Sequence, residues 1–174
     1  MLHALGLLPV DVLEQAQFQI VGRPHDLELT AKIEAAVQEF PGLTYEGGMS
    51  QEEALARIRQ ADVMISASRD ETGPLILMEA LALGTAIIST TVGCVAENLA
   101  GDGAGIFFPP GNESALAAAI TRFVREPKLL AQSRAEARPA YEKYFTFDRF
   151  GQDFSGLIEE AMGAPVASPS ANEI

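Results

Sequence analysis

Short runs of consecutive apolar residues alternate along the chain with longer stretches in which apolar residues recur at helical spacing. Five of the short runs end at glycine, proline, serine or threonine, and they predict β-strands over 17–21, 43–46, 63–67, 86–89 and 105–108. Because these runs are almost uninterrupted, they are typical of parallel strands that are covered on both faces. The pattern therefore predicts an α/β fold of repeated strand–helix units, a parallel sheet with helices on both sides.

The segments between the predicted strands favour amphipathic helices. Apolar side chains recur every three or four positions through 29–40, 116–124 and 147–161, which is the spacing of one helix face. Ser50 and Glu53 have the spacing of a capping box and predict a helix from there to about residue 60.

Both ends of the chain depart from the repeated pattern. The first ten residues are apolar, lack the features of a secretory signal, and predict the end of a helix interrupted at Pro9. Thr146 is the expected N-cap of the last helix. Residues 163–174 are small, polar and broken by proline, which predicts a disordered tail. We therefore expect one domain over residues 1–162.

Composition and charge restrict the possible partners. A chain of 174 residues has the size of one domain, and its net charge of -12 disfavours binding to nucleic acid or to anionic lipid. The single cysteine, Cys94, excludes an internal disulfide and a multi-thiolate zinc site. No apolar run approaches the roughly 18 to 20 residues that span a bilayer. A single cysteine also fits a reducing compartment, and for that reason we expect a cytoplasmic location.

One predicted helix does not follow the amphipathic pattern. Residues 74–83 are apolar on every face except at Glu79, which predicts a helix buried on most sides. An unpaired buried carboxylate is costly, so Glu79 is expected to reach a cation, hydrogen-bond donors or a solvated cleft. Two interpretations stay open: a structural ion pair, or a carboxylate that binds a ligand.

The loop before this helix favours ligand binding. Residues 68–73 connect a predicted strand to the helix, and α/β sheets bind ligands beyond the carboxyl ends of their strands. Gly73 permits close approach, Pro74 suits the first helical turn, and the helix N-terminus offers free N–H groups to a phosphate. Glu71 and Glu79 are then expected to face one ligand and to accept hydrogen bonds from its hydroxyls. This suits a sugar or a ribose better than a base.

These residues carry a resemblance to a known family. ETGPLILME (71–79) is a Glu-x7-Glu motif, preceded by ADVMISAS (61–68) and followed by GTAIISTTVGCVAE (84–97). This ordered set resembles the C-terminal, Rossmann-like domain of group 1 (GT4-type) retaining glycosyltransferases of the GT-B fold. The resemblance extends from residue 20 to the FFPPGN turn at 107–112 and the terminal helices.

The resemblance implies that this domain binds a nucleotide diphosphate sugar and needs no metal or other cofactor. By position, Glu71 would be the catalytic residue at the donor sugar, and Glu79 would hold the ribose hydroxyls. Arg23 and Arg69 would contact phosphate or remain surface cations. The donor-binding candidates are Glu79, Gly73, Pro74, Leu75, Ser68, Arg69 and Arg23.

The sequence departs from the family pattern at two places within the resemblance. Gly73 and Pro74 stand where the family often has an aromatic residue followed by glycine. Cys94 replaces the second glycine of a Gly-Gly-x-x-Glu turn. Neither His3 nor His25 lies in a pairing motif, so Cys94 is expected to be a small packed residue and not a nucleophile.

The resemblance also implies a missing strand. Family members carry an earlier strand, which supplies groups that neutralise the donor pyrophosphate, and before it an acceptor-binding domain. In the family's strand order that strand lies between 17–21 and 63–67. We expect either direct pairing of these two strands or repair of the gap by a second chain, as in a homodimer through an exposed strand edge.

Three functions follow from these features. The first is the donor half of a retaining transferase of polysaccharide biosynthesis. It would move a hexose to a glycan or lipid-linked acceptor, would be inactive or nearly so alone, and would lie in the cytoplasm or at the inner face of the membrane. The second is a non-catalytic α/β fragment that acts as a binding or assembly module. The third is an epimerase on the same fold, against which the Glu-x7-Glu spacing argues.

Overall fold

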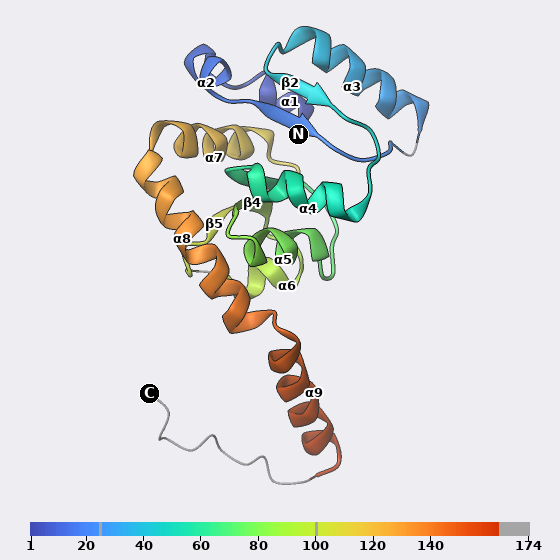
Figure 1. Cartoon of the computed structure of the whole chain (residues 1–174), viewed down its shortest axis with the longest axis vertical. Helices are drawn as coiled ribbons and strands as arrows, with labels where there is room; N and C mark the ends of the chain where they lie inside the picture. Colours follow the sequence, from blue (N-terminus) through green and yellow to red (C-terminus); the bar gives the residue numbers. More distant parts are fainter. Residues whose placement is uncertain (25, 100, 164–174) are drawn as a thin grey trace.

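Parallel strands in two separate sheets form the centre of the chain (Figure 1). The computed structural model describes residues 1–24, 26–99 and 101–163. In the first sheet β1 (Phe18–Ile20) pairs with β2 (Leu43–Tyr45). In the second, β4 (Ala86–Thr90) lies between β3 (Val63–Ser66) and β5 (Gly105–Phe108). Every strand pair is parallel, as the sequence predicts, and each strand overlaps its predicted range.

The helices occupy the connections between the strands and the C-terminal part of the chain. Their bounds are α1 (Leu2–Leu5), α2 (Val10–Gln15), α3 (Leu27–Glu39), α4 (Gln51–Gln60), α5 (Leu75–Ala82), α6 (Gly93–Asn98), α7 (Glu113–Arg125), α8 (Pro127–Tyr144) and α9 (Phe147–Ala161). Pro9 separates α1 from α2, so the predicted interruption is confirmed. The sequence did not predict α8, which contains Pro139 within its length.

Local capping fixes where several of these helices begin. In the predicted capping box, the Glu53 amide donates to Ser50 Oγ at 3.3 Å, and the Ser50 amide donates to Glu53 Oε2 at 2.8 Å. The Ser50 hydroxyl also donates to Glu53 Oε2 at 2.7 Å, and this bond, followed by the one from the Ser50 amide, lowers the pKa of Glu53. Thr146 caps α9 as expected, by accepting from the Arg149 amide at 3.2 Å.

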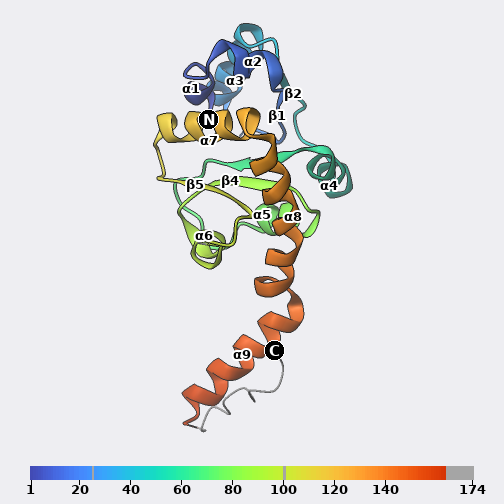
Figure 2. The same cartoon turned by 90° about the vertical axis from the view of Figure 1, so that its left-hand side faces the viewer.

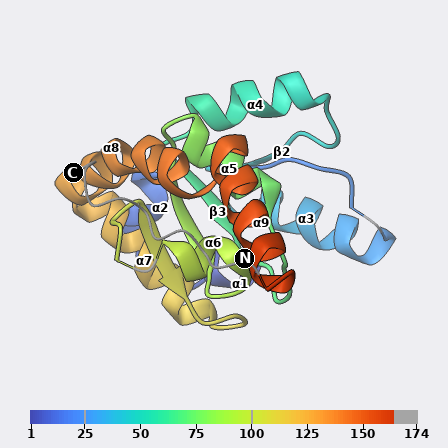
Figure 3. The ribbon, with the colours of Figure 1, turned by 90° about the horizontal axis from the view of Figure 1, so that it is seen from below.

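Two hydrophobic clusters cover opposite faces of the second sheet. Ile88 points into a cluster with α1, α2 and α7, whereas its neighbour Ile87 points into a cluster with α4, α5, α6 and α8. Both side chains are fully buried, because consecutive residues of a strand face opposite sides of the sheet. Seen from below, α4 and α7 accordingly lie on opposite sides of β3 (Figure 3). This confirms the predicted covering of both faces.

The two sheets do not join within the described residues, so of the two expected arrangements the direct pairing of 17–21 with 63–67 is wrong, and repair of the gap by a second chain stays a prediction. Within the described residues, β1 pairs only with β2, and β3 pairs only with β4. The two sheets share one hydrophobic cluster, in which Leu43 of β2 lies with Ile88 of β4, but α3 packs on β2 while α5 and α8 pack on the second sheet. The four residues of β3 are only partly buried, whereas all five residues of β4 are buried, as expected for a strand with one open edge.

The last helix, α9, extends away from the rest of the described chain (Figure 2). None of its residues is buried, and one face carries Phe147, Phe150, Phe154, Leu157 and Ile158, all exposed. No helix among the described residues is long and apolar enough to cross a membrane. The predicted tail falls, beyond Gly163, outside the described residues.

Candidate functional site

A chain of hydroxyl hydrogen bonds supports the loop that follows β3. Thr90, at the carboxyl end of β4, donates from Oγ1 to the Ser68 carbonyl at 2.8 Å. Ser68 Oγ in turn donates to Glu71 Oε1 at 2.9 Å. Because β3 and β4 are neighbours, their carboxyl ends meet here. The Glu71 carboxylate is therefore held through one oxygen, and its other oxygen remains available to a ligand.

The turn between β4 and α6 braces the same loop from a second side. The Cys94 amide donates to the Thr72 carbonyl at 3.1 Å. Gly93 has a φ of +77°, and a Cβ built there would lie 2.9 Å from the Glu71 carbonyl oxygen. Only glycine fits this position without displacing the loop. Cys94 is partly buried and packs against the second hydrophobic cluster.

Helix α5 is less buried than the sequence predicts. Leu77, Ala80 and Leu81 are buried, but Leu75 is 72% exposed and Ile76 is 42% exposed. The predicted burial therefore holds from Leu77 to Ala82, whose residues are all buried or partly buried, and fails at the first turn, where Leu75 and Ile76 meet solvent. Pro74 is the N-cap, one position before the expected first turn, and gives no side-chain cap. The N-cap Pro74 is buried, whereas the side chains of the next two residues are exposed.

Glu79 is partly buried and is held by a neutral partner. Its Oε1 accepts a hydrogen bond from Gln51 Nε2 at 3.2 Å. No salt bridge within the described residues involves Glu79, so the structural ion pair is not observed there. Glu79 thus meets a hydrogen-bond donor, one of the three environments that the sequence allows.

The two carboxylates of the Glu-x7-Glu motif have different neighbours. Glu71 lies in a shallow hollow of about 250 Å³ with Asp70 and Thr72. Glu79 contacts the first residue of α4. A larger hollow, of about 420 Å³, is lined by the segment before α4 and by α4 itself: Glu46, Gly48, Met49, Glu53, Ala56, Arg57 and Gln60. That the Glu71 and Glu79 carboxylates face one ligand stays a prediction.

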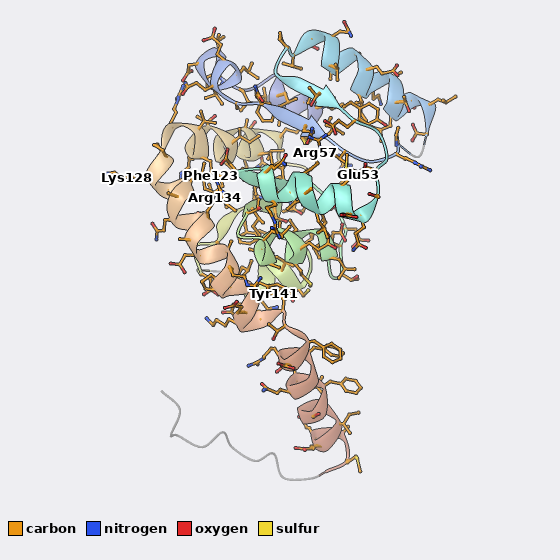
Figure 4. All side chains as sticks on the ribbon, in the orientation of Figure 1. Glu53, Arg57, Phe123, Lys128, Arg134 and Tyr141 are labelled. Atoms are coloured by element: carbon orange, nitrogen blue, oxygen red, sulfur yellow. The ribbon has the colours of Figure 1, made fainter. Side chains whose placement is uncertain are left out.

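Within the larger hollow, Arg57 and Glu46 form an ion pair of 2.8 Å. Figure 4 shows Glu53 and Arg57 together on α4. The backbone at Gly48 also lies against the side chain of Arg23, because a Cβ there would be 2.5 Å from it. This hollow is therefore lined mainly by polar and charged groups.

The two arginines that the sequence proposes for phosphate binding lie at different places. Arg23 is exposed beside the larger hollow. Arg69 is exposed after β3, near the amino group of Met1. The pKa of that amino group is lowered mainly by burial and further by the charge of Arg69, and Glu113 opposes this. His25 lies outside the described residues.

Sequence reasoning did not find Gln51 and Thr90. Each donates a hydrogen bond to a predicted site residue that is distant in the sequence, 28 residues away for Gln51 and 22 for Thr90. Thr90 lies at the end of a predicted strand, which is a weak signal, and Gln51 gave no local signal. No group of three histidine, cysteine, aspartate or glutamate side chains in the described ranges is arranged to hold a metal ion.

The comparison with known families decides the identity. The profile described as "Glycosyl transferases group 1" matches residues 1–139. The chain belongs to the group 1 glycosyltransferases. This group 1 glycosyltransferase chain is 26% identical over 176 residues to a glycogen synthase of Bordetella bronchiseptica, across 93% of its own length and 34% of the relative.

Solved structures confirm the fold of the group 1 glycosyltransferase chain. HepE of Anabaena in complex with UDP superposes with a TM-score of 0.75 at 15% identity, over 91% of this chain and 44% of that one. Sucrose-phosphate synthase of Thermosynechococcus elongatus superposes with a TM-score of 0.73 at 24% identity, over 93% of this chain and 41% of that one. The chain therefore shares its α/β fold with these two proteins, in agreement with the predicted fold class. The chain spans about a third of the glycogen synthase and less than half of either structure.

Proposed function

We propose that the chain is the donor-binding half of a retaining glycosyltransferase. It binds a nucleotide diphosphate sugar, from which the whole enzyme transfers a hexose to a glycan or lipid-linked acceptor. The observation that carries this proposal is the Glu71 loop, which Ser68, Thr90 and the Gly93 turn brace at the carboxyl ends of β3 and β4. A relative of the same fold, HepE, has structures with UDP and with UDP-glucose.

The residues supply three kinds of interaction to such a donor. The Glu71 oxygen that Ser68 leaves free accepts a hydrogen bond from a hydroxyl of the sugar. The open N-terminal turn of α5 attracts the diphosphate, through the Leu75 amide and the positive end of the helix dipole, since Pro74 has no N–H. The same interaction stabilises the charge that develops on the leaving diphosphate. Glu79 accepts hydrogen bonds from the ribose hydroxyls.

Titration calorimetry with uridine, guanosine and adenosine diphosphate sugars, with EDTA present, tests this proposal. We expect one of these donors to bind, weakly and without magnesium, and Glu79→Ala to lower its affinity at least about tenfold, since a charge-assisted hydrogen bond contributes roughly 1.5–3 kcal/mol. Glu34→Ala, an exposed change on α3, serves as the control and keeps the affinity. If no donor binds, or if Glu79→Ala binds as tightly as the parent chain, the proposal is wrong.

The open edges of β1 and β3 support a second candidate, a non-catalytic assembly module. Unpaired strand edges are sites at which another chain can add a strand. Light scattering coupled to size exclusion separates the candidates, because a stable dimer without affinity for any nucleotide sugar favours the module. A monomer that binds a nucleotide sugar favours the donor-binding domain.

A further inference from the structure

The hydrogen bond between Gln51 and Glu79 connects the first residue of α4 to the middle of α5. Gln51 Nε2 donates to Glu79 Oε1 at 3.2 Å, so one carboxylate oxygen has a protein partner. Glu79 carries the only polar side chain of α5. Its orientation is therefore set from outside its own helix, by α4.

Helix α4 is itself held at both ends, so the backbone of Gln51 has a fixed place, and its exposed side chain reaches Glu79 from there. At its start, the capping box of Ser50 and Glu53 flanks Gln51 directly. Near its end, the buried hydroxyl of Thr85 donates to the Ile58 carbonyl at 2.9 Å. Ile58 also packs in one hydrophobic cluster with Leu77 of α5. The first turn of α4 is therefore held in place relative to α5, within reach of Glu79 for the Gln51 side chain.

The chemistry of the partner decides what Glu79 can still do. A lysine or arginine in this place would form an ion pair and compensate the carboxylate charge. The glutamine amide is neutral, donates one hydrogen bond and leaves the charge uncompensated. The second oxygen of Glu79 then remains an acceptor for hydroxyl groups, and hydrogen bonds to a charged acceptor are stronger than those to a neutral one.

We propose that Gln51 is a positioning residue that orients the Glu79 carboxylate toward the ribose hydroxyls of the donor. This inference rests on the proposed function, because it assigns a role to a neighbour of the proposed ribose-binding residue. Gln51 does not itself contact the ribose. Its removal therefore affects only the part of the affinity that depends on the ribose hydroxyls.

The test compares two ligands on each variant by titration calorimetry. The ligands are whichever of UDP, GDP and ADP binds the chain most tightly, and its 2′,3′-dideoxy counterpart. The parent chain is expected to prefer the ribose form about tenfold or more. Gln51→Ala is expected to reduce this preference to about threefold or less while the affinity for the dideoxy form stays unchanged. Gln38→Ala, the same exchange on an exposed position of α3, keeps the full preference.

A second variant, of the same size as the parent side chain, tests whether the charge beside Glu79 matters. Gln51→Glu keeps the size of the side chain but places a like charge beside Glu79, and we expect it to abolish the hydroxyl preference. The double variant Gln51→Glu/Glu79→Gln restores a carboxylate–amide hydrogen bond with the partners exchanged. It is expected to recover the melting temperature that Gln51→Glu loses. Circular dichroism confirms the fold of every variant.

The outcomes separate this inference from the proposed function. If Glu79→Ala abolishes the hydroxyl preference while Gln51→Ala and Gln51→Glu retain it, Gln51 has no positioning role. Equal losses of affinity for both ligands in Gln51→Ala indicate a merely structural role and also overturn the inference. If Glu79→Ala keeps the preference, or if no nucleoside diphosphate binds, the proposed function fails first and this inference fails with it.

Discussion

The hydroxyl of Thr90 donates a 2.8 Å hydrogen bond to the carbonyl of Ser68 and joins the ends of β3 and β4 beneath the Glu71 loop. Thr90 is 1% exposed and Ser68 is partly buried, so this bond forms largely away from solvent. A buried carbonyl that loses its partner pays the full cost of its lost solvation. The loop that carries Glu71 therefore depends on a residue that touches no ligand.

Replacement of Thr90 by valine tests this dependence. Thr90→Val keeps the shape of the side chain and removes the donor, so we expect a loss of about 1–3 kcal/mol in the free energy of unfolding. Urea denaturation measures it. Thr121→Val is the matched control, because Thr121 donates to the Ala117 carbonyl inside α7, where the helix already supplies a partner. Equal losses in the two variants would contradict the prediction.

Position 93 requires glycine because its φ is positive and because backbone atoms lie close to it. Gly111 shares only the positive φ, so a comparison of the two positions measures each effect separately. Gly93 and Gly111 have similar positive φ values, of 77° and 75°, but only Gly93 has backbone atoms close to a built Cβ. Both alanine variants carry the cost of a positive φ, roughly 1–2 kcal/mol. Gly93→Ala must in addition displace the Glu71 carbonyl.

We therefore expect Gly93→Ala to be less stable than Gly111→Ala by about 1 kcal/mol or more, in line with the cost of a strained backbone site. Thermal unfolding of the two proteins measures this difference. Gly93→Ala is also expected to weaken binding of the donor, since the Glu71 loop moves, whereas Gly111→Ala leaves the affinity unchanged. If Gly93→Ala and Gly111→Ala have the same melting temperature, the close approach of the backbone at Gly93 does not affect stability.

An ion pair between α2 and α7 makes stability depend on pH in the acid range. The Arg125 guanidinium donates to both carboxylate oxygens of Asp11, at 2.8 to 3.1 Å. The hydrogen bonds from Arg125, more than its charge alone, lower the pKa of Asp11 from 3.8. A carboxyl group whose pKa is lowered on folding stabilises the protein above its unfolded-state pKa, and this contribution is lost as the pH falls through the folded-state value.

We therefore expect Asp11→Asn to destabilise the protein at neutral pH and to match the parent chain well below pH 3.8. Urea unfolding across this range gives the comparison. Arg125→Gln is expected to lose the same increment, and the double variant is expected to lose no more than either single one. A difference between parent and Asp11→Asn that persists in strong acid would show that the ion pair is not its cause.

Helix α9 contributes little to the stability of the remaining chain. None of its residues is buried, and its aromatic side chains stack mainly on one another, with Phe150 and Phe154 centroids 5.8 Å apart. A chain that ends at Thr146 is expected to melt within about 3 °C of the full chain, which corresponds to roughly 1 kcal/mol at this size. The shorter chain is also expected to be more soluble, because the exposed apolar face is gone. A larger fall in melting temperature would mean that α9 packs on the domain in solution.

Local signals in the sequence predicted the elements whose formation depends on neighbouring residues. The strands were found because their apolar runs are short and bounded, and the starts of α4 and α9 were found because Ser50 and Thr146 cap the amides of the following turn. Helix α8 was missed because its apolar residues are sparse and Pro139 interrupts the expected pattern, although its packing on α5 and β4 holds it helical.

The sequence by itself determined the order of the five strands, the fold class and the Glu-x7-Glu candidates, because each of these is encoded by residues that lie close together along the chain. Only the tertiary structure decided that β1 and β3 stay apart, that the first turn of α5 is exposed, and that Glu79 meets Gln51 and not an arginine. These features result from contacts between residues that are distant in the sequence. They depend on how the helices pack against the two sheets, which no local pattern of residues specifies.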